Sequence, residues 1–328
     1  MLDSIGLPTC HGSSCVRAYY CDEFVLPLPP GHRFPMRKYS LTRELVERNL
    51  PAVKLCVPQA ASNAQLALAH AKDYIEKVDS GRLSQQEQRE VGFPWSQEMV
   101  ARSRRSVGAT ISACRRALSD GVSVNLAGGT HHAYADKGSG FCVFNDAAVA
   151  ARQMQLETLA GHVAIVDLDV HQGNGSASIF HDDPSVFTLS LHAQGNFPFR
   201  KERSDLDVAL PDGTGDDGYL EALGAALAEL DDRFTPDLVI YLAGADPYEG
   251  DRLGRLKLSM QGLASRDRAV FDWAASHELA VAVVMAGGYG HRIEETCAIH
   301  EQTVALALEF FESHAPHRSQ FPHSAMSP

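Results

Sequence analysis

The segment Val163–His171 constrains the fold of this chain more than any other, because polar side chains alternate with aliphatic ones along it. Successive side chains of a strand point to opposite sides, so Asp167, Asp169 and His171 would share one side while valine and leucine occupy the other. Two carboxylates and an imidazole on a buried strand are costly unless they are paired. A divalent cation would pair them. The alternative is a row of hydrogen-bonded core polar groups, which three such residues in register disfavour.

Three further apolar segments also end in residues with acid–base or metal-binding chemistry. They are 122–129, which leads to His131 and His132, 238–246, which ends in Asp246, and 280–286, which leads to Tyr289. In open α/β sheets the site lies just outside the carboxyl ends of the strands. A single His-His pair or a single terminal Asp would be weak support. Together the four segments predict one pocket that collects all of these side chains.

Strand and helix patterns alternate along the chain, which predicts an α/β fold with a mostly parallel central sheet and helices on both faces. Helices are expected near 40–49, 61–78, 95–119, 146–159, 217–231, 260–277 and 292–313, and further strands near 19–21, 186–192 and 207–210. No internal repeat or linker divides the chain. We therefore expect a single catalytic domain over 18–313, with disordered extensions at 1–17 and 314–328.

The composition is that of an ordinary globular protein, with 45% hydrophobic and 21% charged residues among 328. No apolar run reaches the roughly 20 residues that a membrane helix requires, and the amino terminus lacks a signal-peptide pattern. The chain has seven cysteines without paired spacing. An odd number of this kind favours reduced thiols and a cytoplasmic setting.

The net charge of −12 disfavours nucleic-acid binding, which depends on lysine and arginine at phosphates. The densest basic cluster, Arg102–Arg105, is expected to be a solvated helix face. An acidic surface could steer cationic substrates such as lysine-bearing proteins toward the pocket.

Five blocks of the sequence resemble the signature of the histone deacetylase superfamily, and they occur in that family's order between about Tyr19 and Glu312. The blocks are Gly128–Ala133, Gly140–Asp146, Asp167–Gly175, Gly244–Pro247 and Gly287–Tyr289. The stretch Glu249–Leu256 is most similar to the class IV enzymes and their bacterial relatives. The resemblance implies the arginase/deacetylase-like fold.

The resemblance implies that Asp169, His171 and Asp246 bind one zinc ion per chain. Ligand type alone leaves Fe²⁺ and Mn²⁺ open, because two carboxylates make a hard site. Related arginases bind two manganese ions through further aspartates, whereas Gly173 and Tyr248 occupy those places here.

The same resemblance assigns catalytic roles. His132 matches the general base, and His131 matches its partner, which Asp167 orients. Asn174 stands behind His132 where some family members have an aspartate, and a neutral amide there should leave the pKa of His132 lower than a carboxylate would. Tyr289 matches the phenol that stabilises the oxyanion.

Substrate and structural-cation contacts follow from the resemblance as well. Gly140, Phe141, Phe197 and Leu253 match the walls of the substrate tunnel, although either phenylalanine alone could equally be a core residue. A structural K⁺ or Na⁺ is implied, held by residues Asp167, Asp169, His171, Ser190 and Leu191. Arg37 aligns with an arginine of an internal channel, with a surface arginine as the alternative.

The predicted function is a zinc-dependent lysine deacylase that removes acetyl or longer acyl groups from lysine. The segment before Gly92 lacks the acidic residue that clamps peptide backbones in class I and II enzymes, and Leu253 stands where polyamine-selective relatives carry glutamate. The first alternative is a deacetylase of small acylated amines such as acetylpolyamines. The second is a module that binds acyl-lysine without hydrolysing it.

Overall fold

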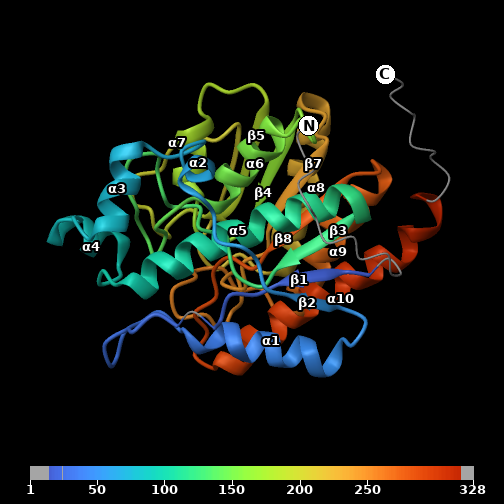
Figure 1. Ribbon diagram of the computed structural model, residues 1–328. Coiled ribbons are helices and arrows are strands. Elements are labelled where there is room, and N and C mark those ends of the chain that lie inside the picture. Colours follow the sequence, from blue (N-terminus) through green and yellow to red (C-terminus); the bar gives the residue numbers. More distant parts are fainter. Residues whose placement is uncertain (1–14, 24, 319–328) are drawn as a thin grey trace, which may run out of the picture.

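The computed structural model describes residues 15–23 and 25–318, and their strands form one eight-stranded sheet. The strands are β1 (Arg17–Tyr19), β2 (Lys54–Cys56), β3 (Val122–Asn125), β4 (Val163–Asp167), β5 (Val186–Ala193), β6 (Leu206–Leu210), β7 (Leu238–Leu242) and β8 (Ala280–Val284). Their order is β2-β1-β3-β8-β7-β4-β5-β6, and each neighbouring pair is parallel. The predicted α/β architecture is confirmed (Figure 1).

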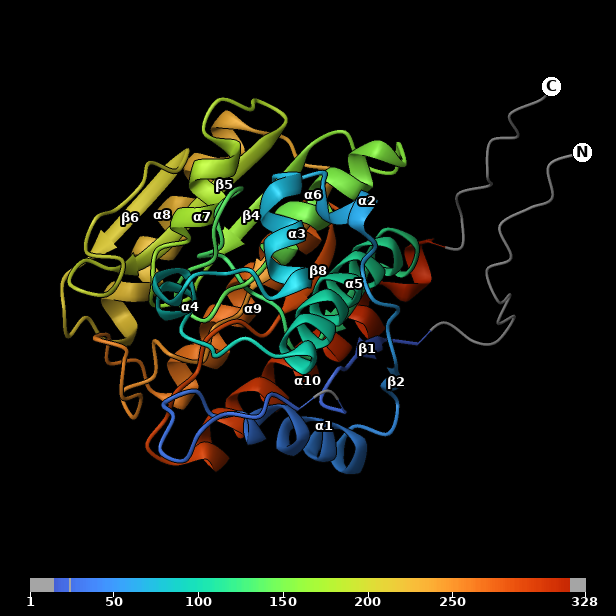
Figure 2. The ribbon, with the colours of Figure 1, turned by 60° about the vertical axis from the view of Figure 1, so that its left-hand side comes forward.

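Helices cover both faces of this sheet (Figures 1 and 2). They are α1 (Arg37–Asn49), α2 (Asn63–Leu66), α3 (Lys72–Ser80), α4 (Gln85–Val91), α5 (Gln97–Asp120), α6 (Asp146–Leu156), α7 (Asn174–Phe180), α8 (Asp216–Arg233), α9 (Met260–Ser276) and α10 (Ile293–Arg318). Alternate residues of a strand enter opposite cores. Val239 and Tyr241 of β7 pack with α8, α9 and α10, whereas Ile240 and Leu242 pack with α5 and α6. Burial on both faces explains the nearly continuous apolar runs in the sequence.

The four strands that carry the predicted site residues are adjacent, in the order β3-β8-β7-β4. Since all are parallel, their carboxyl ends meet at one edge of the sheet. The regular strand β4 ends at Asp167, so Asp169 and His171 lie on the loop beyond it rather than within a strand as the alternation suggested. The side chains still alternate, because Leu168 and Val170 join the same core as Val166.

The predicted helix over 61–78 is wrong as a single element, because the chain forms α2 and α3 with a break between them. Tertiary contacts fix this break. Asn145 N donates to the buried His70 Nε2 at 2.9 Å, and Ala71 N donates to Ala135 O at 2.8 Å. Helix propensity is a weak preference that such contacts override. The short elements β2, α4 and α7 were not predicted.

The described residues run past both limits of the domain expected over 18–313. β1 begins at Arg17, one residue before the predicted domain start, and α10 continues to Arg318, beyond the predicted limit at 313. The rest of the two predicted extensions lies outside the described residues. None of the helices in the described part of the chain combines the length and apolar character of a membrane span.

Candidate active site

The loops that follow β3, β4, β7 and β8 meet at a pocket of about 1080 Å³. As predicted from the strand ends, they bring six chemically active side chains together. These are His131 and His132 after β3, Asp169 and His171 after β4, Asp246 after β7 and Tyr289 after β8. All six are buried, so their electrostatic interactions are stronger than they would be in water.

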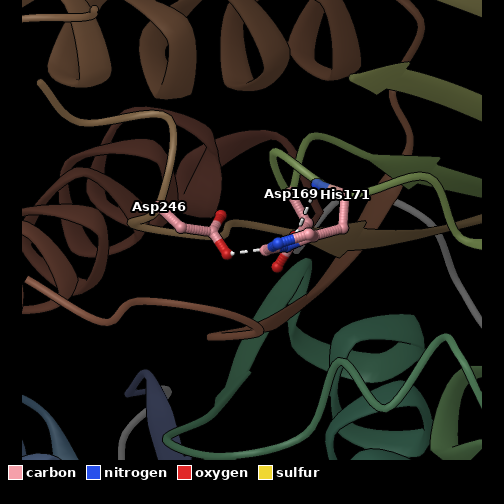
Figure 3. Close-up of side chains that lie close together, drawn as sticks. All are labelled: Asp169, His171 and Asp246. Carbon is pink, nitrogen blue, oxygen red and sulfur yellow. Dashed lines mark hydrogen bonds and ion pairs between the residues drawn. The ribbon is translucent and has the colours of Figure 1, made fainter. Parts of the chain in front are cut away.

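Asp169, His171 and Asp246 direct their side chains toward one another (Figure 3), and one possible ligand atom of each lies within 4.8 Å of the others. His171 Nδ1 lies 2.9 Å from Asp169 Oδ1 and 3.3 Å from Asp246 Oδ2. Burial and the nearby charge of Asp169 raise the pKa of Asp246 above its ordinary value. A cation among these atoms would relieve that repulsion.

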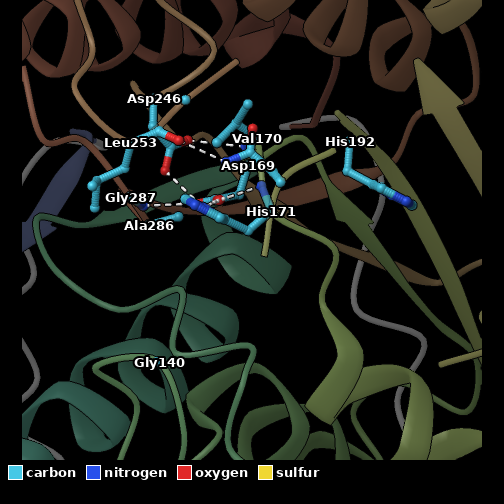
Figure 4. Close-up of polar contacts among 12 residues, drawn as sticks. Gly140, Asp169, Val170, His171, His192, Asp246, Leu253, Ala286 and Gly287 are labelled. Carbon is cyan, nitrogen blue, oxygen red and sulfur yellow. Dashed lines mark hydrogen bonds and ion pairs between the residues drawn. The ribbon is translucent and has the colours of Figure 1, made fainter. Parts of the chain in front are cut away.

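Backbone N–H groups hold the two carboxylates in this arrangement (Figure 4). Gly287 N donates to Asp169 Oδ2 at 2.7 Å, and Val170 N donates to Asp246 Oδ1 at 3.0 Å. Apart from its ion-pair contact with His171 Nδ1 at 3.3 Å, Asp246 Oδ2 accepts no hydrogen bond from the described residues. Glycine is needed at 287, since a Cβ there would lie 1.9 Å from that oxygen. One imidazole and two carboxylates, with one buried oxygen left for a ligand, fit a divalent cation.

His131 is held by Asp167, the last residue of β4. His131 Nδ1 and Asp167 Oδ2 are 2.6 Å apart, and Asp169 N donates to the other oxygen of Asp167 at 3.1 Å. Burial alone would lower the pKa of His131, but the charges of Asp167 and Asp169 raise it to about 9. The ring therefore favours the positively charged form, which suits it to stabilise negative charge nearby.

His132 lies in a different environment. Its Nδ1 lies 2.6 Å from Asn174 Oδ1, and Asn174 Nδ2 donates to the Tyr134 hydroxyl at 2.8 Å. The amide oxygen can only accept, so His132 Nδ1 carries the proton and its Nε2 keeps a lone pair. Burial, followed by the charges of His131 and His171, lowers the pKa of His132 well below its ordinary value. A neutral imidazole with a free Nε2 has the form required of a general base.

Hydrogen bonds to the backbone N–H and carbonyl groups of Tyr289 hold this residue in position. Tyr289 N donates to Asp251 Oδ2 at 2.6 Å, and Arg252 Nε donates to Tyr289 O at 2.8 Å. Its ring centroid lies 6.4 Å from that of His171 and 6.0 Å from that of Phe141. Burial and the charge of Asp169 raise the pKa of the Tyr289 phenol well above its ordinary value. The phenol thus keeps its proton and can donate a hydrogen bond.

All four predicted substrate-contact residues line the pocket: Gly140, Phe141, Phe197 and Leu253. The ring of Phe197 packs edge-on against His132 with centroids 4.9 Å apart. Gly140 has a φ of 54°, and a Cβ there would lie 2.6 Å from His132 Cδ2, so only glycine allows this approach. The two phenylalanines are therefore pocket walls as well as packing residues.

Ser190 and Leu191, the predicted structural-cation residues of β5, lie beside the end of β4. Ser190 pairs with Asp167 in the parallel register, and both Ser190 and Leu191 are buried. The next residue of β5, His192, lies apart from Asp169, His171 and Asp246 in Figure 4, with its Nδ1 3.0 Å from Ser190 Oγ. The predicted monovalent cation stays a prediction.

Arg37 does not lie in the pocket. It is exposed at the start of α1, so the surface alternative applies. The neighbouring Lys38 is only 1% exposed, and its Nζ donates to Ala286 O at 3.0 Å and Gly288 O at 3.4 Å. Lys38 was not predicted; it lies four residues before the buried Thr42, on the core-facing side of the helix.

Arg102 also corrects a prediction, because it is buried rather than part of a solvated helix face. Its guanidinium lies over the ring of Tyr39, 4.4 Å from the centroid, and both residues line the pocket. Arg104, in the same cluster, pairs with Asp79. Arg102 and Arg104 thus make two different structural contacts, one with an aromatic ring and one with a carboxylate.

Asp146 supports the loop that carries His131 and His132, and no role was predicted for it. Its carboxylate accepts from Gly129 N at 3.1 Å, Thr130 N at 2.7 Å and the Thr110 hydroxyl at 2.6 Å. Asp146 is the first residue of α6. Acidic residues are common at the starts of helices, so its position in the sequence did not indicate a contact with the histidine loop.

Comparisons with known proteins agree with this geometry. A family model described as the histone deacetylase domain matches residues 32–305. The chain is 44% identical to an uncharacterized protein of Picosynechococcus sp. over 86% of this chain and 94% of that protein. It is 36% identical to histone deacetylase 2 of Arabidopsis thaliana, over 71% of this chain and 62% of that protein. It is 31% identical to the acetoin utilization protein AcuC of Bacillus subtilis, over 70% of this chain and 65% of that protein. The solved structure of the HDA15 HD domain has the same fold, with a TM-score of 0.76, 22% identity and 93% of each chain covered.

Proposed function

The chain belongs to the histone deacetylase family, and on this premise we propose that it is a zinc-dependent lysine deacylase. The observation that carries the proposal is the meeting of a candidate metal site, a neutral histidine and a protonated tyrosine at one pocket. Asp169, His171 and Asp246 would hold the ion. A bound Zn²⁺ would polarise the acyl carbonyl and lower the pKa of a water molecule.

The residues of this chain would perform the proton transfers. His132 Nε2 takes a proton from the attacking water while the water oxygen bonds to the acyl carbon. Tyr289 donates a hydrogen bond to the carbonyl oxygen as negative charge develops there, and the charged His131 adds to that stabilisation. His132 then gives its proton to the lysine nitrogen as the carbon–nitrogen bond breaks. The products are a carboxylic acid and a free ε-amine.

The walls of the pocket support a linear acyl-lysine as substrate. Phe141 and Phe197 offer apolar faces for a methylene chain, as the resemblance implies. The lining of the same pocket, of about 1080 Å³, also includes Ser106 and Thr130. Acyl groups longer than acetyl are therefore included in the proposal.

The chain's cysteines and strand β5 support two further parts of the proposal. Ser190 and Leu191 are proposed to hold a structural K⁺ or Na⁺ beside Asp167. The protein is proposed to work in the reducing cytoplasm, since the six cysteines among the described residues are all free.

The test is turnover of one lysine peptide that carries acetyl, octanoyl or myristoyl groups, measured beside N-acetylputrescine, with Tyr289→Phe as the control. Turnover of an acyl-peptide that collapses in Tyr289→Phe supports the lysine deacylase. Turnover of N-acetylputrescine alone would replace it with a small-molecule deacetylase. Bound zinc without any turnover would favour an acyl-lysine-binding module.

A further inference from the structure

The mouth of the pocket is basic although the whole chain carries a net charge of −12. Among the residues that line the pocket, the exposed cations outnumber the acidic side chains at the mouth, which are Glu90 and Glu202. The exposed cations are Arg33, Arg89, Lys137, Arg200, Arg252 and Arg255. The local charge is thus opposite to the net charge, and it corrects the expectation that an acidic surface attracts cationic substrates.

Few of these cations are neutralised by a partner. Arg255 pairs with Asp212 at 2.9 Å. The other five form no ion pair with any described residue, and we call them the cationic rim: Arg33, Arg89, Lys137, Arg200 and Arg252. Arg252 is held in place by carbonyl oxygens, at 2.8 Å from Tyr289 O and 3.3 Å from Arg33 O.

The two acidic residues at the mouth do not balance the cationic rim. Glu90 accepts a hydrogen bond from Gln86 at 3.0 Å, and Glu202 accepts one from the Tyr134 hydroxyl at 3.2 Å. Each carboxylate is therefore bound to a neutral partner. Both carboxylates keep their negative charge, and these two charges against the five cations of the rim still leave an excess of positive charge that a ligand can use.

The rim residues come from five separate segments of the chain. Arg33 precedes α1, Arg89 lies on α4, Lys137 lies between β3 and α6, Arg200 lies between β5 and β6, and Arg252 lies between β7 and α9. Five segments of the chain thus contribute cations to the lining of this pocket. This arrangement suits negative charges distributed along an extended ligand better than a single small anion.

We propose that the substrate is an acyl-lysine flanked by aspartate and glutamate, in an acidic peptide segment. This inference rests on the proposed lysine deacylase activity and names its substrate class. The acyl-lysine enters the pocket while the flanking carboxylates lie against the cationic rim. Lysine-rich segments and polyamines are disfavoured, because their ammonium groups meet like charges at the mouth.

The test compares kcat/KM for peptides with one central acyl-lysine flanked on both sides by Glu, Gln or Lys. We expect kcat/KM to decrease in the order Glu, Gln, Lys. At low salt the value for the Glu peptide should be about ten times that for the Lys peptide. The ratio should shrink at about 0.15 M salt, where exposed charges are screened beyond roughly 8 Å. Free Nε-acyl-lysine, a zwitterion that lacks flanking carboxylate side chains, serves as the small-substrate comparison.

The variant Arg89→Glu/Arg200→Glu should reverse the preference, so that the Lys peptide becomes the better substrate. The control Arg48→Glu/Lys72→Glu makes the same charge change at exposed residues outside the pocket and should keep the wild-type order. Equal rates for the three peptides, or equal effects of the two variants, would overturn the inference and leave the deacylase proposal standing. Faster turnover of free Nε-acyl-lysine than of any peptide would also overturn it. Absence of all peptide turnover would remove the proposed function itself and this inference with it.

Discussion

The ammonium nitrogen of Lys38 lies 3.0 Å from the carbonyl oxygen of Ala286 and so joins α1 to the loop that carries Tyr289. The same nitrogen donates to Gly288 O at 3.4 Å and lies 5.4 Å from the centroid of the Tyr289 ring. Lys38 is almost fully buried, so these carbonyl groups replace water as its hydrogen-bond partners. Residues far apart in the sequence thus fix the backbone on both sides of Gly287.

Replacing Lys38 by methionine should therefore impair both catalysis and stability. Loss of the donor leaves two buried carbonyl oxygens with fewer partners, which costs about 2 kcal/mol of unfolding free energy. Tyr289 becomes less well placed, and kcat should fall about tenfold with a smaller change in KM. Arg37→Ala, a change at the exposed neighbour, is the control and should behave like the wild type. Wild-type kcat in Lys38→Met would show that the contact does not position Tyr289.

The meeting of the strand ends could be predicted from sequence, because it follows from the geometry of parallel sheets. Buried strands such as Val163–Asp167 have unbroken apolar runs, and the residues just after them must lie at one edge. The resemblance to a family then supplied the roles that geometry alone leaves open. Those roles stay predictions for His132, Asn174 and the other site residues.

The supporting contacts could not be predicted, because they depend on which side chain of a helix faces the pocket. Arg37 and Lys38 are adjacent and chemically alike, yet one is exposed and the other is buried. Arg102 was expected in water and instead lies over Tyr39. Long basic side chains tolerate both environments, so composition does not distinguish them.

Asn174→Asp tests the base assignment through pH. The amide of Asn174 is neutral, and burial keeps the pKa of His132 well below its ordinary value. A carboxylate at 174 would stabilise the imidazolium and raise that pKa. Because the base acts when unprotonated, the acid limb of the kcat/KM profile should move to higher pH by about one unit or more. Asn174→Ala is the control, and it should not move the acid limb to higher pH. An unmoved limb in Asn174→Asp would argue against His132 as the base.

His300 should make the protein sensitive to acid. Both ring nitrogens are buried and have no hydrogen-bond partner among the residues that the structure describes, and burial lowers the pKa of His300 well below 6.5. Between pH 6.5 and that lowered pKa the unfolded chain binds a proton that the folded chain does not, so stability falls as pH falls. The loss of stability grows from pH 7 to pH 5, as the unfolded chain takes up this proton. Urea unfolding of His300→Leu should show a weaker loss over that range, whereas the exposed His181→Asn should match the wild type. An equal loss of stability in His300→Leu and the wild type would exclude His300 as a source of the acid sensitivity.

Leu253→Glu should shift specificity toward polyamines. Leu253 lines the pocket beside Arg252, and Leu253 N donates to Asp251 Oδ1 at 2.7 Å, so its position is fixed. A carboxylate there would pair with the distant ammonium of N-acetylputrescine, and kcat/KM for that substrate should rise about tenfold relative to an acyl-peptide. Leu253→Gln has the same shape without the charge and should not give this gain. If Leu253→Gln gives an equal gain, size rather than charge controls entry.

Removal of the metal should destabilise the fold, because Asp169 and Asp246 would then face each other in a buried site without a cation. An ion that binds only the folded chain adds RT ln(1 + [L]/Kd) to its stability, about 4 kcal/mol at a thousandfold excess over Kd. Chelation should therefore lower Tm by several degrees, and added Zn²⁺ should restore it with about one ion per chain. In Asp246→Asn the zinc-dependent shift should disappear, since the Oδ2 that lacks a hydrogen-bond partner becomes part of a neutral amide. Asp272→Asn alters an exposed carboxylate of α9 and should keep the full shift. A full zinc-dependent shift in Asp246→Asn would mean that the stabilising ion binds elsewhere, and the ligand assignment would then be wrong.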